Sequence, residues 1–293
     1  MKCFNPIRII PKGSPAMLVR CNKCLACREE IAKEYTARFI HEAKYYKHLY
    51  FLTLTYDDEH LVLNKYGVGT LVKKHIVDYI KRVNIHCKRK GLGKYIYFLA
   101  GEYGEGMRPH YHITIGVDNS LILFEFGNEW PFGLVNGLRE EASIKSIFYT
   151  IGYSEKKINN VNTDNYFIEN DLVPPFRKFS RGLGLRWYEE NKHSIAKKYY
   201  LNLGKQRIGL PTYYKRKLKE ELLVDVNELQ SKVSEQTRKL LDFYNELYKI
   251  KKLDYYDEQL DDLFEIEKKI RSTQKQRRRL YEERQRRKKK GKL

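Results

Sequence analysis

The pattern with the clearest chemical meaning in the chain is His110-Tyr111-His112. Side chains two residues apart on a strand point the same way, so both imidazoles would project together while Tyr111 enters the core. Glu102 precedes them in a Gly-rich stretch, and a hairpin would bring its carboxylate beside them. Two imidazoles and one carboxylate suit Mg²⁺ or Mn²⁺ and leave positions open for phosphate oxygens. Glu105, in the turn, is the weaker candidate, and a purely structural histidine pair is the alternative.

Tyr149 and Tyr153 form the second candidate group. Their spacing of four residues places both hydroxyls on one face of a helix. A tyrosyl oxygen can attack a phosphodiester and hold the 5′ phosphate covalently. Lys156 and Lys157 follow at once and could lower a tyrosine pKa or neutralise charge on the reacting phosphate. The alternative is ordinary core packing of two tyrosines.

Four of the five cysteines lie within the first 27 residues, as Cys3, Cys21, Cys24 and Cys27. In a reducing compartment this density favours metal binding over disulfides. Three cysteines at this spacing can bind one ion, and Cys3 could complete a tetrahedral, structural Zn²⁺ site. An iron–sulfur cluster and a set of reduced, partly buried thiols are the alternatives. Cys87 fits the buried face of a helix and needs no further role.

The elements around these residues predict an α+β fold with a central antiparallel sheet and flanking helices, packed on one face. Helical spacing runs through Ile31, Tyr35, Phe39 and Ala43. Aromatic and β-branched residues predict strands; the strands are Tyr50–Tyr56, Lys94–Gly101 and His110–Gly116, and two further helices are Val72–Lys90 and Glu141–Lys157.

The helix at Val72–Lys90 has a well-defined apolar side. Thr70 is placed to cap its start and Gly91 to end it. Its inner residues are predicted to be Val72, Ile76, Tyr79, Ile80, Val83 and Cys87.

Four sections are expected along the chain. A cysteine module and helix occupy residues 1–48, and the mixed α/β domain occupies residues 49–215. Residues 216–274 carry a heptad pattern, which predicts a coiled coil or helical hairpin and allows self-association through residues 222–270. Residues 275–293 hold eleven basic and two acidic residues and are expected to have no fixed fold.

The formal net charge of +20 predicts a polyanionic partner. Nucleic acid is the first candidate, through phosphate contacts and counterion release, and an anionic membrane surface is the rival. No apolar stretch reaches the roughly 18 residues that a membrane span needs. Met1–Pro11 lacks the apolar region of a signal peptide, so the cytoplasm is the expected location.

Several ordered motifs resemble those of one protein family. The chain is similar to the replication initiator proteins of microviruses of the gokushovirus type, in the HUH endonuclease superfamily. The motifs that carry the resemblance are Cys21–Arg28, Phe51–Leu61, Leu99–Ile113, Ala142–Lys157 and Gly209–Glu221.

The resemblance assigns roles to the candidate residues. It implies that His110 and His112 are the paired metal ligands, that Glu102 is the third, and that Tyr149 and Tyr153 are two nucleophiles. Either Lys157 or Lys156 would be the accompanying lysine.

The implied activity is metal-dependent nicking of a viral replication origin, with a 5′-phosphotyrosyl intermediate and later rejoining. Its setting would be the cytoplasm of an infected bacterium, with host helicase and polymerase as partners. The rivals are a transposase or plasmid relaxase of the same chemistry, a non-catalytic DNA-binding protein, and a coiled-coil scaffold on an anionic membrane.

Overall fold

The computed structural model divides into two compact units, Arg28–Val224 and Met1–Cys27 with Asp225–Leu293. The predicted nucleophiles Tyr149 and Tyr153, the lysines at 156 and 157, and the heptad segment 223–271 lie outside the described residues. The described residues are 3–10, 17–138, 141–142, 147, 151, 166–198, 200–203, 206–222, 272, 275, 278–279 and 282.

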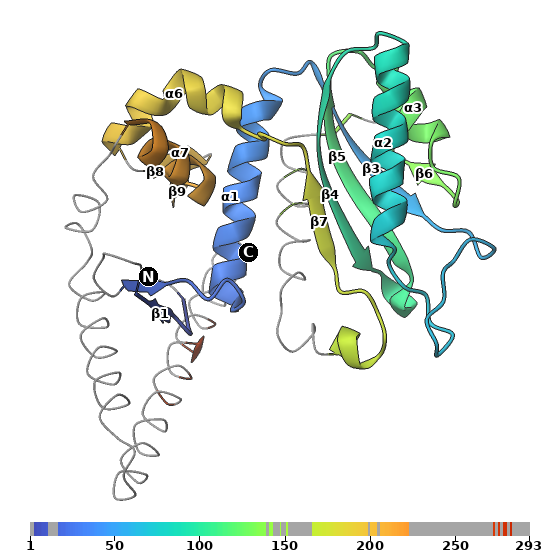
Figure 1. Ribbon diagram of the computed structural model, residues 1–293, viewed down its shortest axis with the longest axis horizontal. Helices are drawn as coiled ribbons and strands as arrows, with labels where there is room; N and C mark the ends of the chain where they lie inside the picture. Colours follow the sequence, from blue (N-terminus) through green and yellow to red (C-terminus); the bar gives the residue numbers. More distant parts are fainter. Residues whose placement is uncertain are drawn as a thin grey trace, which may run out of the picture. The chain divides into compact units, whose positions relative to one another are not determined.

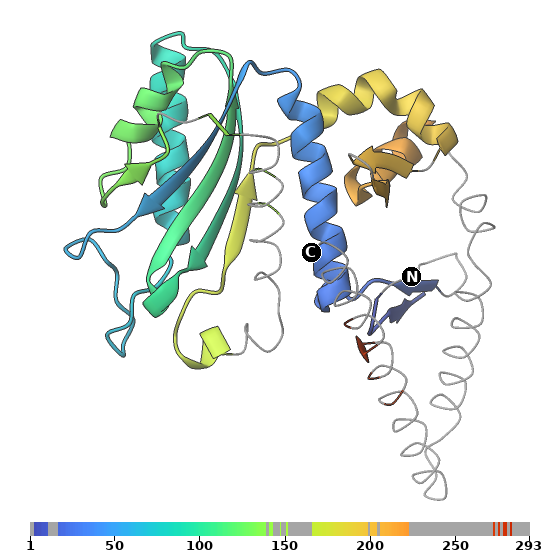
Figure 2. The same cartoon turned by 180° about the vertical axis from the view of Figure 1, so that it is seen from behind.

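A five-stranded sheet forms the centre of the larger unit. Its strand order is β6-β3-β5-β4-β7, and every neighbouring pair is antiparallel. The central antiparallel sheet predicted from the sequence is therefore confirmed, although its two edge strands, β6 and β7, were not predicted (Figures 1 and 2). The strands are β3 (His48–Thr55), β4 (Tyr95–Tyr103), β5 (Pro109–Val117), β6 (Val135–Asn136) and β7 (Phe176–Phe179).

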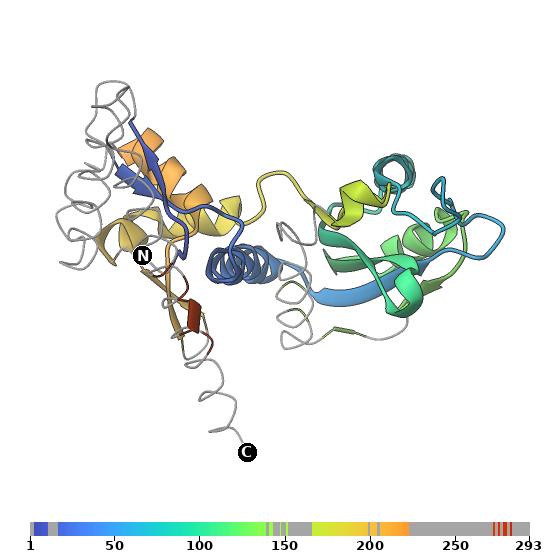
Figure 3. The same ribbon diagram turned by 90° about the horizontal axis from the view of Figure 1, so that it is seen from below.

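Helix α2 (Lys73–Arg89) covers one face of this sheet (Figure 3). Its buried residues are those predicted at helical spacing, except that Val72 precedes the helix as its N-cap. The predicted capping role of Thr70 is wrong. Its hydroxyl bonds the Tyr103 hydroxyl at 3.3 Å and accepts the backbone N–H of Val173 at 3.0 Å. Gly91 follows the helix with φ of +63°, which suits its predicted role at the end.

Helix α1 (Leu25–Ala43) packs on the other face of the sheet. Its Phe39 and Ala43 share a core with Phe98 and Ala100 of β4. The expectation of helices on one face alone is therefore wrong, because β4 is apolar on both faces and needs cover on both. The predicted start of a helix at Glu141 is also wrong, since Glu141 forms an isolated β-bridge with Tyr50.

A second small core lies beyond β7. It packs helix α6 (Leu185–Lys198) and α7 (Thr212–Leu222) around the hairpin β8 (Tyr200–Leu203) and β9 (Gln206–Gly209), against Ala37 of α1. The Gly209–Glu221 motif supplies most of α7, whose Tyr214 and Leu218 are buried there.

The N-terminal unit contains a two-stranded antiparallel sheet, β1 (Ile7–Ile9) and β2 (Met17–Val19), followed by the start of α1. Within the described part of the chain, no helix combines the length and apolarity needed to cross a membrane.

The second core contains a titratable group that predicts a pH effect. His41 stacks on Trp187 with ring centroids 3.6 Å apart, and its Nδ1 lies 3.1 Å from the Tyr214 hydroxyl. Burial, with a smaller contribution from Lys44, lowers its pKa from 6.5 to about 3. The unfolded chain therefore binds a proton near pH 6.5 that the folded chain refuses, and the free energy of unfolding should fall as pH drops from 6.5 toward 3.

Urea unfolding of the full chain, followed by tryptophan fluorescence at several pH values, measures this effect. His41→Phe should retain the ring stacking and show a shallower acid slope, by up to about one proton. The exposed His193→Gln serves as the control and should keep the parent slope. Equal slopes for the parent chain and His41→Phe would contradict the prediction.

Candidate metal centre

The hairpin of β4 and β5 brings the three predicted metal ligands together. Glu102 is paired directly with His110, and Ala100 with His112. A short 3-10 turn at Glu105–Met107 joins the two strands. Because side chains alternate along a strand, both histidines and Glu102 project from the same face of the sheet.

The ligand atoms of the three side chains converge. Nε2 of His112 lies 3.0 Å from Oε1 of Glu102, and Nε2 of His110 lies 3.4 Å from the same oxygen. The Glu102 side chain is only 3% exposed, whereas those of His110 and His112 are 18% and 21% exposed. The carboxylate thus forms the floor of the group, and the imidazoles form its solvent-facing wall.

The other ring nitrogen of each histidine has a partner of its own. Nδ1 of His112 lies 3.1 Å from Oγ1 of Thr53, and Nδ1 of His110 lies 3.3 Å from the carbonyl oxygen of Arg108. If Nδ1–H donates to these oxygens, each Nε2 keeps a free lone pair directed at the group. Such partners fix the tautomer and orientation of metal-ligating histidines.

Gly104 leaves the space that the His110 ring needs. A Cβ at this position would lie 3.1 Å from Cε1 and 3.3 Å from Nδ1 of His110, both on the ring. A side chain there would push the imidazole away from Glu102, so the glycine of this stretch supports the ligand geometry.

Tyr111 anchors the ligand strand from its opposite face. Its hydroxyl accepts the backbone N–H of Val72 at 2.9 Å and lies 2.9 Å from the hydroxyl of Tyr56. Burial raises the pKa of Tyr111, so the side chain stays protonated. The bonds tie the centre of β5 to the start of α2 and hold both neighbouring histidines in place.

The donor set fits a divalent cation. In octahedral coordination with bonds of about 2.1 Å, neighbouring ligand atoms lie about 3 Å apart, close to the separations in this group. The same separations also suit an imidazolium hydrogen-bonded to a carboxylate, so binding must be tested with the metal itself. Glu105 lies in the turn, and its side chain is outside the described residues.

A second group of possible ligands, His86, Glu125 and Glu129, differs in its surroundings. Lys90 Nζ lies 2.7 Å from Glu125, and Arg82 Nε lies 3.2 Å from Glu129. Protein cations already neutralise both carboxylates, so this group is an ion-pair network that joins α2 to α3 (Ile122–Asn128).

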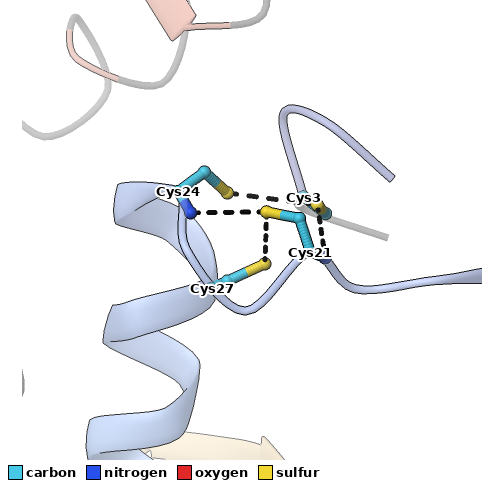
Figure 4. A group of neighbouring side chains, drawn as sticks. All are labelled: Cys3, Cys21, Cys24 and Cys27. Atoms are coloured by element: carbon cyan, nitrogen blue, oxygen red, sulfur yellow. Dashed lines mark hydrogen bonds between the residues drawn. The ribbon is translucent and has the colours of Figure 1, made fainter. Parts of the chain in front are cut away.

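The third group contains the four N-terminal cysteines (Figure 4). Their ligand atoms all lie within 4.8 Å of one another. Contacts with neighbouring thiols lower the pKa of Cys24 and raise that of Cys27. Cys87 lies apart from them, buried on α2 as expected.

The segment that carries the two predicted tyrosine nucleophiles is described only at Ile147 and Ile151. Both are helical and buried, in the core that contains Phe98 and Ala100 of β4. Ala100 pairs with His112, so this core adjoins the three ligands on the same face of the sheet.

Thr53 is the residue of the site that sequence reasoning missed. Alternation in Tyr50–Tyr56 places Thr53 on the face opposite Leu52 and Leu54, which was a usable signal. Its pairing with His112 depends on the register of β3 against β5, which the local sequence does not reveal.

Comparisons with known proteins place the chain among phage replication proteins. The model of a family described as replication-associated protein ORF2 matches residues 49–158, which include all three ligands. No solved structure matches the chain.

Three relatives extend this match over most of the chain. Replication-associated protein ORF2 of Spiroplasma virus 4 is 30% identical over 243 residues, covering 75% of each chain. Replication-associated protein VP4 of Bdellovibrio phage phiMH2K is 27% identical, covering 73% of this chain and 76% of its own. Replication-associated protein ORF4 of Chlamydia phage 1 is 26% identical, covering 78% of this chain and 58% of its own. The resemblance to microvirus-type replication proteins is therefore confirmed, and the chain belongs to the family of the replication-associated protein ORF2.

Proposed function

We propose that the protein initiates rolling-circle replication of a viral genome by nicking one DNA strand at the origin, as an endonuclease of the HUH type. The observation that carries the proposal is the convergence of Glu102 Oε1 with the Nε2 atoms of His110 and His112 on one face of the sheet. The names of the three phage relatives support a role in replication.

Glu102, His110 and His112 would hold one Mg²⁺ or Mn²⁺. When bound, the cation neutralises charge on the phosphate to be cleaved. Thr53 and the Arg108 carbonyl keep both imidazoles in the ligating orientation. The partial exposure of the two imidazoles lets a phosphate approach from solvent.

Tyr149 and Tyr153 are the proposed nucleophiles. A tyrosyl oxygen forms a bond to phosphorus as the bond between phosphorus and the 3′ oxygen breaks. The phenol loses its proton and the 3′ oxygen gains one, so the products are a 5′-phosphotyrosyl ester and a 3′-OH. One ester replaces another, so rejoining needs no ATP.

Two tyrosines solve a problem of occupancy. A replication round needs a second cleavage while the first phosphotyrosyl bond still exists, and a single nucleophile is then occupied. Tyrosines one helical turn apart, about 6 Å along the axis, could serve one centre in turn. Lys156 or Lys157 would stabilise the charge on the reacting phosphate. The burial of Ile147 and Ile151 beside the ligands supports this placement.

The net charge of +20 supports DNA as the partner. Basic residues at 275–293 would add sequence-independent phosphate contacts, while the origin would be single-stranded at the nick. Host helicase and polymerase would then extend the free 3′-OH, in the bacterial cytoplasm.

The first prediction concerns the metal. Glu102→Gln and His112→Ala should each weaken Mn²⁺ binding at pH 7.5 by at least about tenfold, because each removes one of three ligands. Isothermal titration calorimetry on the full chain measures this.

The matched control for the metal test is His86→Asn, in the ion-pair network of α2 and α3, which should leave Mn²⁺ affinity unchanged. Equal losses at His86 and His112 would show that the measured ion is not held by the proposed centre. DNA binding should survive in all three variants.

A second prediction concerns Thr53. Thr53→Val keeps the shape of the side chain but removes the oxygen that faces Nδ1 of His112. Loss of such a partner lowers metal affinity by about 10- to 100-fold in other sites. Thr53→Ser, which retains the hydroxyl, should restore most of the affinity. Normal Mn²⁺ binding by Thr53→Val would leave Thr53 with a packing role only.

A third prediction concerns the tyrosines. On supercoiled viral duplex DNA with Mn²⁺, each single Tyr→Phe variant should retain some first-strand nicking but fail to complete and recircularise strands. The double variant should form no covalent protein–DNA adduct. Tyr166→Phe, an exposed tyrosine outside the proposed set, is the control.

The adduct assay also separates the rival functions. If Tyr149→Phe alone abolishes every adduct and Tyr153→Phe completes termination normally, the enzyme uses one tyrosine. A protein that binds DNA but never forms an adduct is a non-catalytic binder. Nicking of unrelated DNA in preference to the viral origin would favour a transposase or relaxase.

A further inference from the structure

The tetrathiolate cluster, defined as Cys3, Cys21, Cys24 and Cys27, lies where three pieces of the N-terminal unit meet (Figure 4). Cys3 precedes β1, Cys21 follows β2, and Cys24 and Cys27 lie at the start of α1. All five cysteines of the chain are free. The sequence alone left three possibilities for the four: zinc, an iron–sulfur cluster or reduced thiols.

We infer that this cluster is a structural zinc site that fastens the β1–β2 hairpin to the first turn of α1. The Sγ atoms of Cys21 and Cys27 lie 3.9 Å apart, and those of Cys24 and Cys3 lie 4.0 Å apart. Tetrahedral zinc with Zn–S bonds of about 2.3 Å requires sulfurs about 3.8 Å apart. A disulfide requires about 2.05 Å, so the cluster has the spacing of metal ligands.

Backbone N–H groups directed at the sulfurs give independent support. Sγ of Cys24 accepts from Phe4 N at 3.4 Å, Sγ of Cys3 from Cys21 N at 3.4 Å, and Sγ of Cys21 from Cys24 N at 3.3 Å. A neutral thiol is a weak acceptor, whereas a metal-bound thiolate carries charge that such donors stabilise. The backbone is folded to support thiolates.

The ligand set distinguishes zinc from other groups. Four soft sulfurs without an oxygen or nitrogen ligand favour zinc or iron over Mg²⁺ or Mn²⁺. Ligand atoms all within 4.8 Å of one another enclose a single ion and leave little room for a multi-iron cluster. Four protein ligands also fill a tetrahedral shell, so no position stays open for substrate, and the role is structural.

The hairpin itself shows why an ion is needed. Each of its strands has three residues, and Ile7 and Ile9 of β1 are 49% and 38% exposed. A two-stranded hairpin is marginal in water without a packed face. Zinc binding would then supply folding free energy directly.

The test is metal analysis of the full chain, purified without chelator. About one zinc per chain is expected, falling below about a tenth in Cys24→Ser and Cys27→Ser. Cys87→Ala, in the buried cysteine of α2, is the matched control and should keep the zinc. Glu102→Gln should keep it too, which separates this site from the proposed catalytic centre.

A second measurement does not depend on the folding of variants. Adding Co²⁺ to the metal-stripped parent chain should give thiolate-to-cobalt charge-transfer bands and the d–d bands of a tetrahedral site, and zinc should displace them. Absence of these bands together with absence of zinc would overturn the inference. So would stoichiometric iron in place of zinc, or equal zinc loss in Cys87→Ala and Cys24→Ser.

Discussion

The two-residue repeat of strand β5 is the constraint on which the rest of the candidate centre depends. Tyr111 and Ile113 are fully buried on the α2 side, which forces His110 and His112 to the other face. A slip of one residue would reverse this and put both imidazoles in an apolar core. The Tyr111 hydroxyl, bonded to the backbone at Val72, holds the register from the side opposite the ligands. The packed face of the sheet thereby specifies the geometry of its reactive face.

The sequence could predict the part of the site that local rules control. Alternation along one strand and a short turn suffice to bring Glu102 beside His110 and His112. Thr53 could not be predicted as a partner, because it enters from a strand 59 residues away in sequence. Strand order and register come from the packing of the whole sheet, and these decide which hydroxyl meets the second ring nitrogen.

The errors in the predicted fold have similar causes. The edge strands β6 and β7 have two and four residues, too few to show a period of two. Thr70 has the sequence position of a helix cap, but the long-range partners Tyr103 and Val173 compete for its hydroxyl and win. One signal was available: the near-continuous apolar run of β4 is typical of a strand covered on both faces.

If both proposals hold, the chain keeps two metal ions apart by ligand chemistry. Zinc binds nitrogen and oxygen ligands more tightly than Mn²⁺ does, so the centre at Glu102 cannot select its ion by affinity alone. Four thiolates bind zinc in a closed shell, whereas two imidazoles and a carboxylate leave positions that only phosphate or water can fill. Loss of the first ion would unfold the hairpin, and loss of the second would spare the fold and remove charge neutralisation. The buried side of β5 explains that difference, because it stabilises the ligand strand without any metal.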